Sequence, residues 1–316
     1  MARFSINKIF AIAIILLVIL LISVSFINEH KEEDLSPKEV VVTTTLSKPL
    51  EIWVSSNQLK QGDTLVVVGE NLKTGQKITG EFAQKKFDFI PTENNEKLIG
   101  IIGIDVRKTP ADYLLRIFFD NEEKFNKKIT ITKGDFYVTK FVLTPELEAK
   151  GYTPSNIVET IGTKDNVLID QVLKKYTPKS YFDKPFVYPL NSIVDVGAFG
   201  NIRKSGDVSL RHLGVDLDAK INTPVYVIND GMVSFVQELT EYGKIIIIDH
   251  GLGIYSLYLH LNEFKVAEGD QVTRGEVIGL SGSTGYSLDP HLHLSIKANG
   301  ASVDPLRFIN AVNNTF

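Results

Sequence analysis

Two histidines, His291 and His293, are separated by one leucine in the run PHLHLSI. Successive side chains of a β-strand point to opposite faces, so both imidazoles would share one face and Leu292 would lie on the other. Two steps along a strand put the Cα atoms about 6.6 Å apart, and from that distance both rings can reach one ion. The spacing indicates part of a metal site, although two surface histidines at this spacing also arise by chance.

A second candidate pair is His212 and Asp216, in the run RHLGVDLDA. In a straight strand their Cα atoms would be about 13 Å apart, too far for two ligands that each lie about 2 Å from a metal. The chain must bend between them, and Gly214 permits a bend. Two imidazoles and a carboxylate suit zinc and leave a fourth position open for water. Taken alone, a surface histidine and a turn aspartate explain this pair equally well.

His260 ends another apolar run, YSLYLHLN, and supplies a third element. A lone histidine at such a place is usually structural. Here three separate segments of a histidine-poor region each contribute imidazole at the edge of a β-rich run, and this conjunction favours one shared site. His250, in IDHGLG, is interpreted as structural or supporting, and His30 as part of a tether.

The composition limits what these residues can do. The 316-residue chain is 43% hydrophobic with a formal charge of -4, which is typical of a globular protein with about two folded units. Nucleic acid is a poor candidate partner because no concentrated basic face is indicated. Cysteine is absent, which excludes a thiolate metal site, a disulfide framework and a cysteine nucleophile. Any metal must therefore bind histidine and carboxylate.

Residues 9–27 contain no charged side chain over 19 positions, enough to cross a hydrocarbon layer of about 30 Å as a helix. Arg3 and Lys8 precede this segment and acidic residues follow it, so the positive-inside rule places the remainder outside the cytoplasm. Residues 1–29 are therefore predicted to hold a cytoplasmic stub and a single transmembrane helix in the cytoplasmic membrane. A cleaved signal peptide, which would leave the chain secreted, is the alternative.

The remaining sequence is mainly β, with one helical interval. Residues 30–39 read as a charged tether, and residues 40–135 carry short β-rich runs between turns, typical of a small β-sandwich-like domain. That domain has no histidine and is interpreted as a spacer, with Trp53 in its core. Residues 136–183 form a partly helical connector, because SNIVETIGTKDNVLIDQVLKKY has apolar residues at helical intervals. Residues 184–316 return to β-rich runs and hold the histidine constellation.

Residues 189–307 resemble the lysostaphin/LytM-type zinc metallopeptidases, which cut peptidoglycan peptides. The resemblance runs in order through FGNIR, RHLGVDLDA, YGKIIIIDHGLGIYSLYLHL, GDQVTRGEVIGLSGSTGYS, PHLHLSI and VDPLRF. It implies a β-rich fold with a narrow groove, and one zinc ion per chain bound by His212, Asp216 and His293. It also implies that His260 and His291 are catalytic histidines that move protons, with the base and acid roles unassigned between them. The β-rich unit upstream resembles the small β-domain often found before such peptidases.

The implied function is that of a zinc metalloendopeptidase that hydrolyses peptide cross-links of bacterial peptidoglycan outside the cytoplasmic membrane. Divisome proteins and other wall hydrolases are candidate partners. The alternative is a catalytically silent domain that binds or activates another wall hydrolase. Silent members of the family usually lack ligand residues, whereas all five positions are intact here. A third hypothesis is a peptidase that acts on a protein substrate, because the motif does not reveal which side chains the groove accepts.

Three positions depart from the family's pattern. Ser295 stands where relatives commonly have an acidic residue, and Asp289 where a small residue is usual. Some relatives also carry an upstream tyrosine thought to stabilise the oxyanion, but residues 202–211 contain none. Arg203 or Arg211 is a hypothetical source of positive charge in its place.

Overall fold

The computed structural model describes residues 50–71, 77–92 and 97–316. The predicted transmembrane segment, residues 9–27, and the predicted tether, residues 30–39, lie outside the described residues. Within the described ranges, no helix has both the length and the apolar character needed to cross a membrane. Lys48–Phe316 groups into one unit by its internal contacts.

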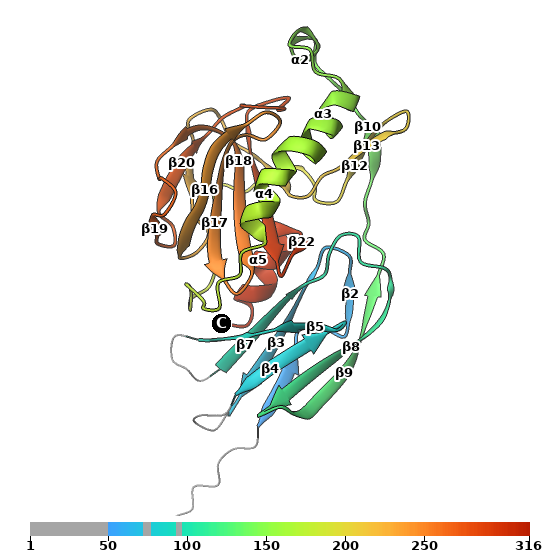
Figure 1. The fold of residues 1–316 in the computed structure, drawn as a ribbon, viewed down its shortest axis with the longest axis vertical. Helices are drawn as coiled ribbons and strands as arrows, with labels where there is room; N and C mark the ends of the chain where they lie inside the picture. Colours follow the sequence, from blue (N-terminus) through green and yellow to red (C-terminus); the bar gives the residue numbers. More distant parts are fainter. Residues whose placement is uncertain (1–49, 72–76, 93–96) are drawn as a thin grey trace, which may run out of the picture. The chain divides into compact units, whose positions relative to one another are not determined.

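The N-terminal part of this unit consists of two β-sheets that share an apolar core (Figure 1). The strands are β1 (Glu51–Val54), β2 (Gln58–Lys60), β3 (Thr64–Glu70), β4 (Ile78–Phe82), β5 (Lys85–Phe87), β6 (Phe89–Pro91), β7 (Lys97–Gly103), β8 (Ala111–Phe119) and β9 (Glu122–Thr132). One sheet has the order β1-β3-β7-β6 and the other β2-β9-β8-β4-β5. The prediction of a β-rich region here is confirmed.

Strand β3 is buried along almost its whole length. Leu65 and Val67 belong to the core between the two N-terminal sheets, whereas Val66 and Val68 belong to the core of the C-terminal region. A continuous apolar run is typical of a strand that is covered on both faces. The run LVVV therefore reflects two cores meeting at one strand.

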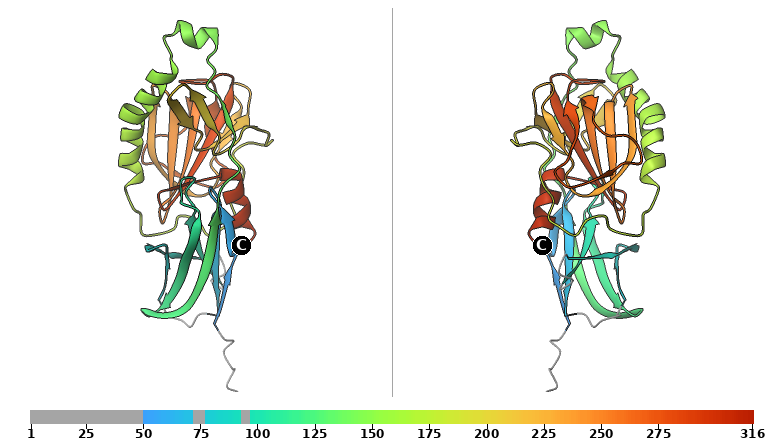
Figure 2. Two further views of the ribbon diagram at one scale, coloured as in Figure 1. Left: turned by 90° about the vertical axis from the view of Figure 1, so that its right-hand side faces the viewer. Right: turned by 90° about the vertical axis from the view of Figure 1, so that its left-hand side faces the viewer.

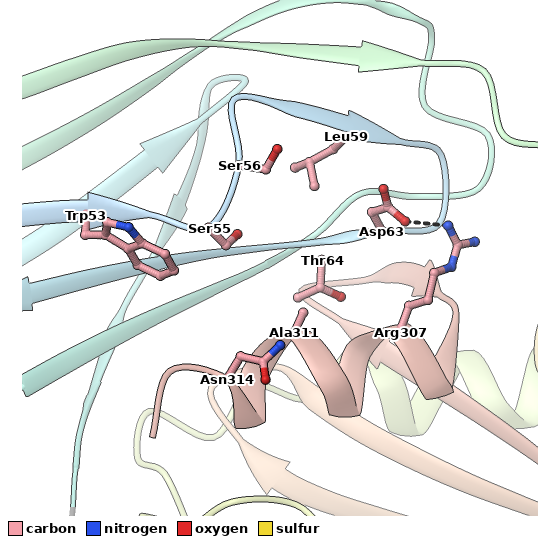
Figure 3. A pocket seen from close by; sticks show the side chains of 9 residues that line it. All are labelled: Trp53, Ser55, Ser56, Leu59, Asp63, Thr64, Arg307, Ala311 and Asn314. Carbon is pink, nitrogen blue, oxygen red and sulfur yellow. Dashed lines mark hydrogen bonds and ion pairs between the residues drawn. The ribbon is translucent and has the colours of Figure 1, made fainter.

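The prediction that Trp53 lies in the core is wrong, because its side chain is 52% exposed. Among the described residues, strand β1 lies at the edge of its sheet and pairs with β3 alone, and alternation along a strand does not reveal an edge. The indole borders a cavity of about 480 Å³ beside helix α5 (Pro305–Asn313), where Asp63 and Arg307 form an ion pair of 2.5 Å (Figure 3). In the part of the chain that the structure describes, no histidine lines this cavity.

The C-terminal region is built on a ten-stranded sheet with the main order β11-β14-β21-β18-β17-β16-β19. Its strands are β11 (Asp195–Gly197), β14 (Val215–Asp218), β15 (Pro224–Tyr226), β16 (Gly231–Leu239), β17 (Gly243–Gly251), β18 (Ile254–Phe264), β19 (Gln271–Val272), β20 (Val277–Ser281), β21 (His291–Ala298) and β22 (Ala301–Val303). The central strands are nearly all buried. This sheet confirms the predicted β-rich C-terminal region and supplies the frame of the histidine site.

A helix of 20 residues lies against this sheet (Figures 1 and 2). It runs without a break through α3 (Pro154–Thr160), the π-helical turn η1 (Ile161–Asp165) and α4 (Asn166–Leu173), and a short helix α2 (Pro145–Ala149) precedes it. A capping box between Thr153 and Asn156 begins it. Ile169 and Val172 pack against apolar side chains of β16, β17 and β18. The predicted helical interval is confirmed.

The predicted connector also contributes a strand. Strand β10 (Val138–Lys140) pairs in parallel with β12 (Ile202–Ser205), which forms a hairpin with β13 (Val208–Arg211). All three residues of β10 are exposed, so no apolar pattern marked it as a strand. The boundaries proposed at residues 135, 183 and 184 stay predictions.

Candidate metal centre

Strands β14 and β21 place Asp216 directly opposite His293. The Asp216 Oδ1 atom lies 2.8 Å from His293 Nδ1 and 2.9 Å from His212 Nε2. These two nitrogens are 3.0 Å apart. One potential ligand atom from each of the three residues therefore lies within 4.8 Å of the others. The structure brings the two predicted pairs together.

Two glycines make room for this cluster. The chain bends between β13 and β14, and a Cβ atom at Gly214 would lie 2.3 Å from the Leu294 carbonyl oxygen. On the other side, a Cβ atom at Gly197 of β11 would lie 2.3 Å from Asp216 Oδ2. Both distances are too short for any other residue type, so the backbone can approach only at glycine. The predicted bend at Gly214 is confirmed.

Hydrogen bonds fix the proton on each ligand imidazole. His212 Nδ1 lies 3.0 Å from the Ala198 carbonyl oxygen, so this nitrogen donates and Nε2 keeps its lone pair. His293 Nε2 lies 2.9 Å from Ser295 Oγ. The Ser295 hydroxyl donates its single proton to the Leu213 carbonyl at 3.0 Å, so its oxygen accepts from Nε2 and leaves Nδ1 unprotonated.

The cluster consequently fits a divalent cation. Two imidazole lone pairs and a carboxylate oxygen face one another across about 3 Å, an arrangement that repels itself unless a positive charge lies between them. Neutral imidazole and carboxylate are ligands of catalytic zinc, and a set of three leaves one position open. The donor set is therefore chemically suited to zinc.

His260 lies on β18 at a bulge, where the register with β17 shifts by one residue. Its backbone has a φ of 60°, a left-handed conformation that non-glycine residues seldom adopt and that is concentrated at functional sites. The ring donates from Nδ1 to the Thr284 carbonyl at 2.8 Å. Its Nε2 atom is thereby left with a lone pair for chemistry.

His291 lies beside this ring, with 4.9 Å between the two ring centroids. Its Nδ1 atom lies 2.7 Å from the Asp289 carbonyl oxygen and donates to it. Its Nε2 atom lies 3.4 Å from Asp216 Oδ1. His291 and His293 therefore share one face of β21, as the alternation predicted, and His260 joins them from β18.

Burial and hydrogen bonding set the charges of these groups in the metal-free chain. Burial opposes ionisation of Asp216, but in the metal-free chain a proton bound by His212, His291 or His293 at the nitrogen facing this carboxylate is donated to it, and these contacts outweigh burial and hold the pKa of the carboxyl far below its usual range. Burial lowers the pKa of His260 to about 3 and that of His293 to about 4. Burial also opposes protonation of His291, yet its bond to Asp216 prevails and raises the pKa. The site thus favours an ionised Asp216 beside neutral His260 and His293.

His250 lies away from this cluster and is fully buried. Its Nδ1 atom donates to the Asp230 carbonyl at 2.8 Å, and its Nε2 atom lies 2.8 Å from Ser256 Oγ. Both ring nitrogens are satisfied inside the core. This geometry agrees with the structural interpretation of His250.

Burial lowers the pKa of His250 to about 4, below the value of about 6.5 in an unfolded chain. The unfolded state then binds more protons between these values, so stability is complete above pH 6.5 and falls as the pH drops toward 4. As the pH falls from 7 to 5, we expect proton uptake by His250 in the unfolded state to lower the free energy of unfolding by about 2 kcal/mol. Urea unfolding of His250→Gln at both pH values should show a smaller loss than the original chain; an equal loss would contradict the assignment.

Arg203 of β12 reaches the site, whereas Arg211 does not. The Nη2 atom of Arg203 lies 3.6 Å from Asp216 Oδ2. Arg211 donates to the Gly200 carbonyl at 3.0 Å, and its guanidinium lies over the ring of Phe136. Arg203 also lies near the ring of Tyr286. The sequence pattern did not predict Tyr286 as a site residue, because it lies in a stretch typical of turns.

Ser295 is expected to support metal binding through His293. Ser295→Ala removes the acceptor for Nε2–H, so the ring loses its fixed orientation, and zinc affinity should fall about 10- to 100-fold. Competition with a chromogenic chelator would measure this change. Ser295→Thr keeps the hydroxyl and is the matched control, with affinity close to that of the original chain. Equal affinity for the alanine and threonine variants would show that the hydroxyl has no such role.

The chain has relatives among known peptidases. Residues 210–305 match the family model described as Peptidase family M23. The DD-carboxypeptidase/endopeptidase Mpg of Neisseria meningitidis serogroup B is 44% identical over 95 residues, which are 30% of this chain and 22% of Mpg. The peptidoglycan DD-endopeptidase ShyA of Vibrio cholerae is 35% identical over 123 residues, which are 38% of this chain and 29% of ShyA. The chain thus spans less than a third of the length of these curated relatives.

Solved structures are also similar to this chain. The catalytic domain of the antimicrobial peptidase lysostaphin from Staphylococcus simulans is 31% identical, with 44% of this chain and 96% of that domain covered and a TM-score of 0.31. A peptidase M23 protein from Pseudomonas aeruginosa covers 78% of this chain and 93% of its own, with a TM-score of 0.54 and 22% identity, which shows a likeness of fold. The family model and the His-Asp-His cluster inside the matched segment together identify residues 210–305 as a segment of peptidase family M23.

Proposed function

We propose that this chain is a zinc-dependent endopeptidase that hydrolyses peptide cross-links of bacterial peptidoglycan. The observation that carries the proposal is the convergence of His212, Asp216 and His293 within ligand distance, with His260 and His291 beside them. ShyA, a relative of the matched segment, is named as a peptidoglycan DD-endopeptidase, and this supports the same polymer as the substrate here.

Each residue has a distinct part in the proposed mechanism. His212, Asp216 and His293 hold the metal. Bound zinc supplies a Lewis acid for the peptide carbonyl and lowers the pKa of water. His260 and His291 exchange protons at Nε2 with the attacking water and the departing amine, because Nδ1 of each ring is engaged by a backbone carbonyl.

The proposed location is the outer face of the cytoplasmic membrane. Residues 9–27 and the flanking Arg3 and Lys8 support an anchor with the peptidase outside the cytoplasm. Fusion of a periplasmic reporter enzyme after residue 316 tests the orientation, because an active reporter requires export. Fractionation of the fused chain separates an anchored chain from a secreted one. Divisome and wall-hydrolase partners belong to the same proposal.

The decisive experiment incubates the purified full chain with isolated sacculi of several cross-link types. We expect about one zinc ion per chain and new free amines in at least one type of sacculus. A chelator should stop amine release, and added zinc should restore it. Mass spectrometry of the released peptides then identifies the bond that is cut.

His293→Ala provides the control, because it removes a ligand imidazole while the neighbouring core leucines stay in place. This variant should lose zinc and amine release together. A zinc-loaded chain that releases no amines from any sacculus, yet stimulates another wall hydrolase, would replace the proposal with the catalytically silent alternative.

A further inference from the structure

Arg203 presents a guanidinium that the carboxylate of Asp216 does not occupy. The 3.6 Å between Arg203 Nη2 and Asp216 Oδ2 is too long for a hydrogen bond. The imidazoles contact the other oxygen, Oδ1. The side chain of Arg203 is 29% exposed. Apart from a contact with the Tyr286 side chain, its donors therefore stay available at the edge of the site.

An aromatic wall holds this guanidinium in place. Its carbon lies 5.9 Å from the ring centroid of Tyr286, within the range of a cation–π contact. The Tyr286 ring is itself buried and lies 5.8 Å from the ring of Phe141 and 6.3 Å from that of Tyr152. Fixed donors of this kind cost no reorganisation when charge develops beside them.

The position of Arg203 is unfavourable for metal binding alone. A guanidinium is permanently charged, and it lies beside residues suited to a divalent cation. The carboxylate of Asp216 offsets only one of the two positive charges of such an ion. An added positive charge therefore weakens cation binding. A negative charge that appears in the site during the reaction would offset this cost, in addition to the ion pair with Asp216.

We propose that Arg203 is a catalytic residue that stabilises the oxyanion formed on the scissile carbonyl, an inference that rests on the peptidase function proposed above. Addition of the water oxygen to the carbonyl carbon moves the C=O π pair onto the carbonyl oxygen. His260 or His291 accepts the proton that the attacking water loses. Collapse re-forms C=O and breaks the C–N bond, and the protonated imidazole gives this proton to the leaving amine. The charge that Arg203 meets exists only after the addition, so the contact is stronger in the transition state than with substrate.

The test compares Arg203→Met with Lys204→Met, which removes a positive charge from the same strand at an exposed position. The substrate is the cross-linked peptide that the original chain cuts. A phosphinic isostere of this peptide serves as an inhibitor whose affinity is measured in parallel. For Arg203→Met we expect kcat to fall about 100- to 1000-fold with little change in KM. Affinity for the phosphinic isostere should fall by the same factor as kcat/KM. Zinc affinity should stay equal or increase, and Lys204→Met should match the original chain in every measurement.

Four results would overturn this inference. Unchanged kcat in Arg203→Met would remove Arg203 from the reaction. A loss of zinc affinity that accounts for the loss of activity would make Arg203 a positioning residue for Asp216. A larger loss of kcat in Arg211→Met would transfer the role to Arg211. If the original zinc-loaded chain cuts no peptide, the peptidase proposal fails and this inference fails with it.

Discussion

Asp216→Asn is expected to lower kcat/KM about 1000-fold, because bound zinc supplies several kcal/mol of transition-state stabilisation and each 1.4 kcal/mol is tenfold in rate. Asp216 provides the negative charge on which His212 and His293 converge. A neutral amide of the same shape keeps the packing but binds a cation weakly. Zinc content after gel filtration and amine release from sacculi measure the two expected losses.

Asp218→Asn is the matched control. Asp218 lies two residues further along β14, with its side chain exposed, and belongs to the same run RHLGVDLDA. We expect zinc content and turnover to be unchanged in this variant. Full zinc content and full turnover in Asp216→Asn would contradict the ligand assignment. Equal losses in both variants would indicate a folding defect of the strand instead.

Loss of His260 should abolish proton transfer and leave the metal in place. We expect His260→Asn to lower kcat about 100- to 10,000-fold, the usual contribution of a positioned acid or base. Asparagine is the suitable replacement because the φ of 60° at this position strains alanine more than asparagine. Zinc content should stay at that of the original chain, since the ligand atoms come from other residues.

His291→Ala gives an independent comparison on the neighbouring strand. Its effect on kcat should be of the same order, and zinc should again be retained. Turnover near that of the original chain in either variant would remove that histidine from the proton-transfer steps. Loss of zinc in either variant would instead make that residue a metal ligand.

Much of the site could be predicted because its signals are local. Alternation along a strand predicted that His291 and His293 share a face, and ligand distances predicted a bend at Gly214. The bulge at His260 could not be predicted, because its register depends on how β18 pairs with β17. The role of Gly197 was also missed, since nothing in its own segment indicates that a carboxylate lies against it.

The fold was predictable where apolar periodicity is strong and less so elsewhere. The helical interval and both β-rich regions follow from their patterns. Trp53 was misplaced because a strand's own sequence does not reveal whether neighbours cover it. Strand β10 was missed because it is short and exposed, and it is held by its pairing with β12. In both cases the deciding contacts come from distant parts of the chain.

Strand β3 limits how this protein can be recombined. Val66 and Val68 contribute to the core that lies beneath the catalytic sheet, so cutting the chain after the N-terminal sheets would uncover an apolar surface. A fusion of residues 184–316 alone to another membrane anchor would expose that apolar surface to solvent, and we expect such a fusion to aggregate. A cassette of Lys48–Phe316 keeps both cores together, and a chimaera that keeps both sides of β3 retains the native packing.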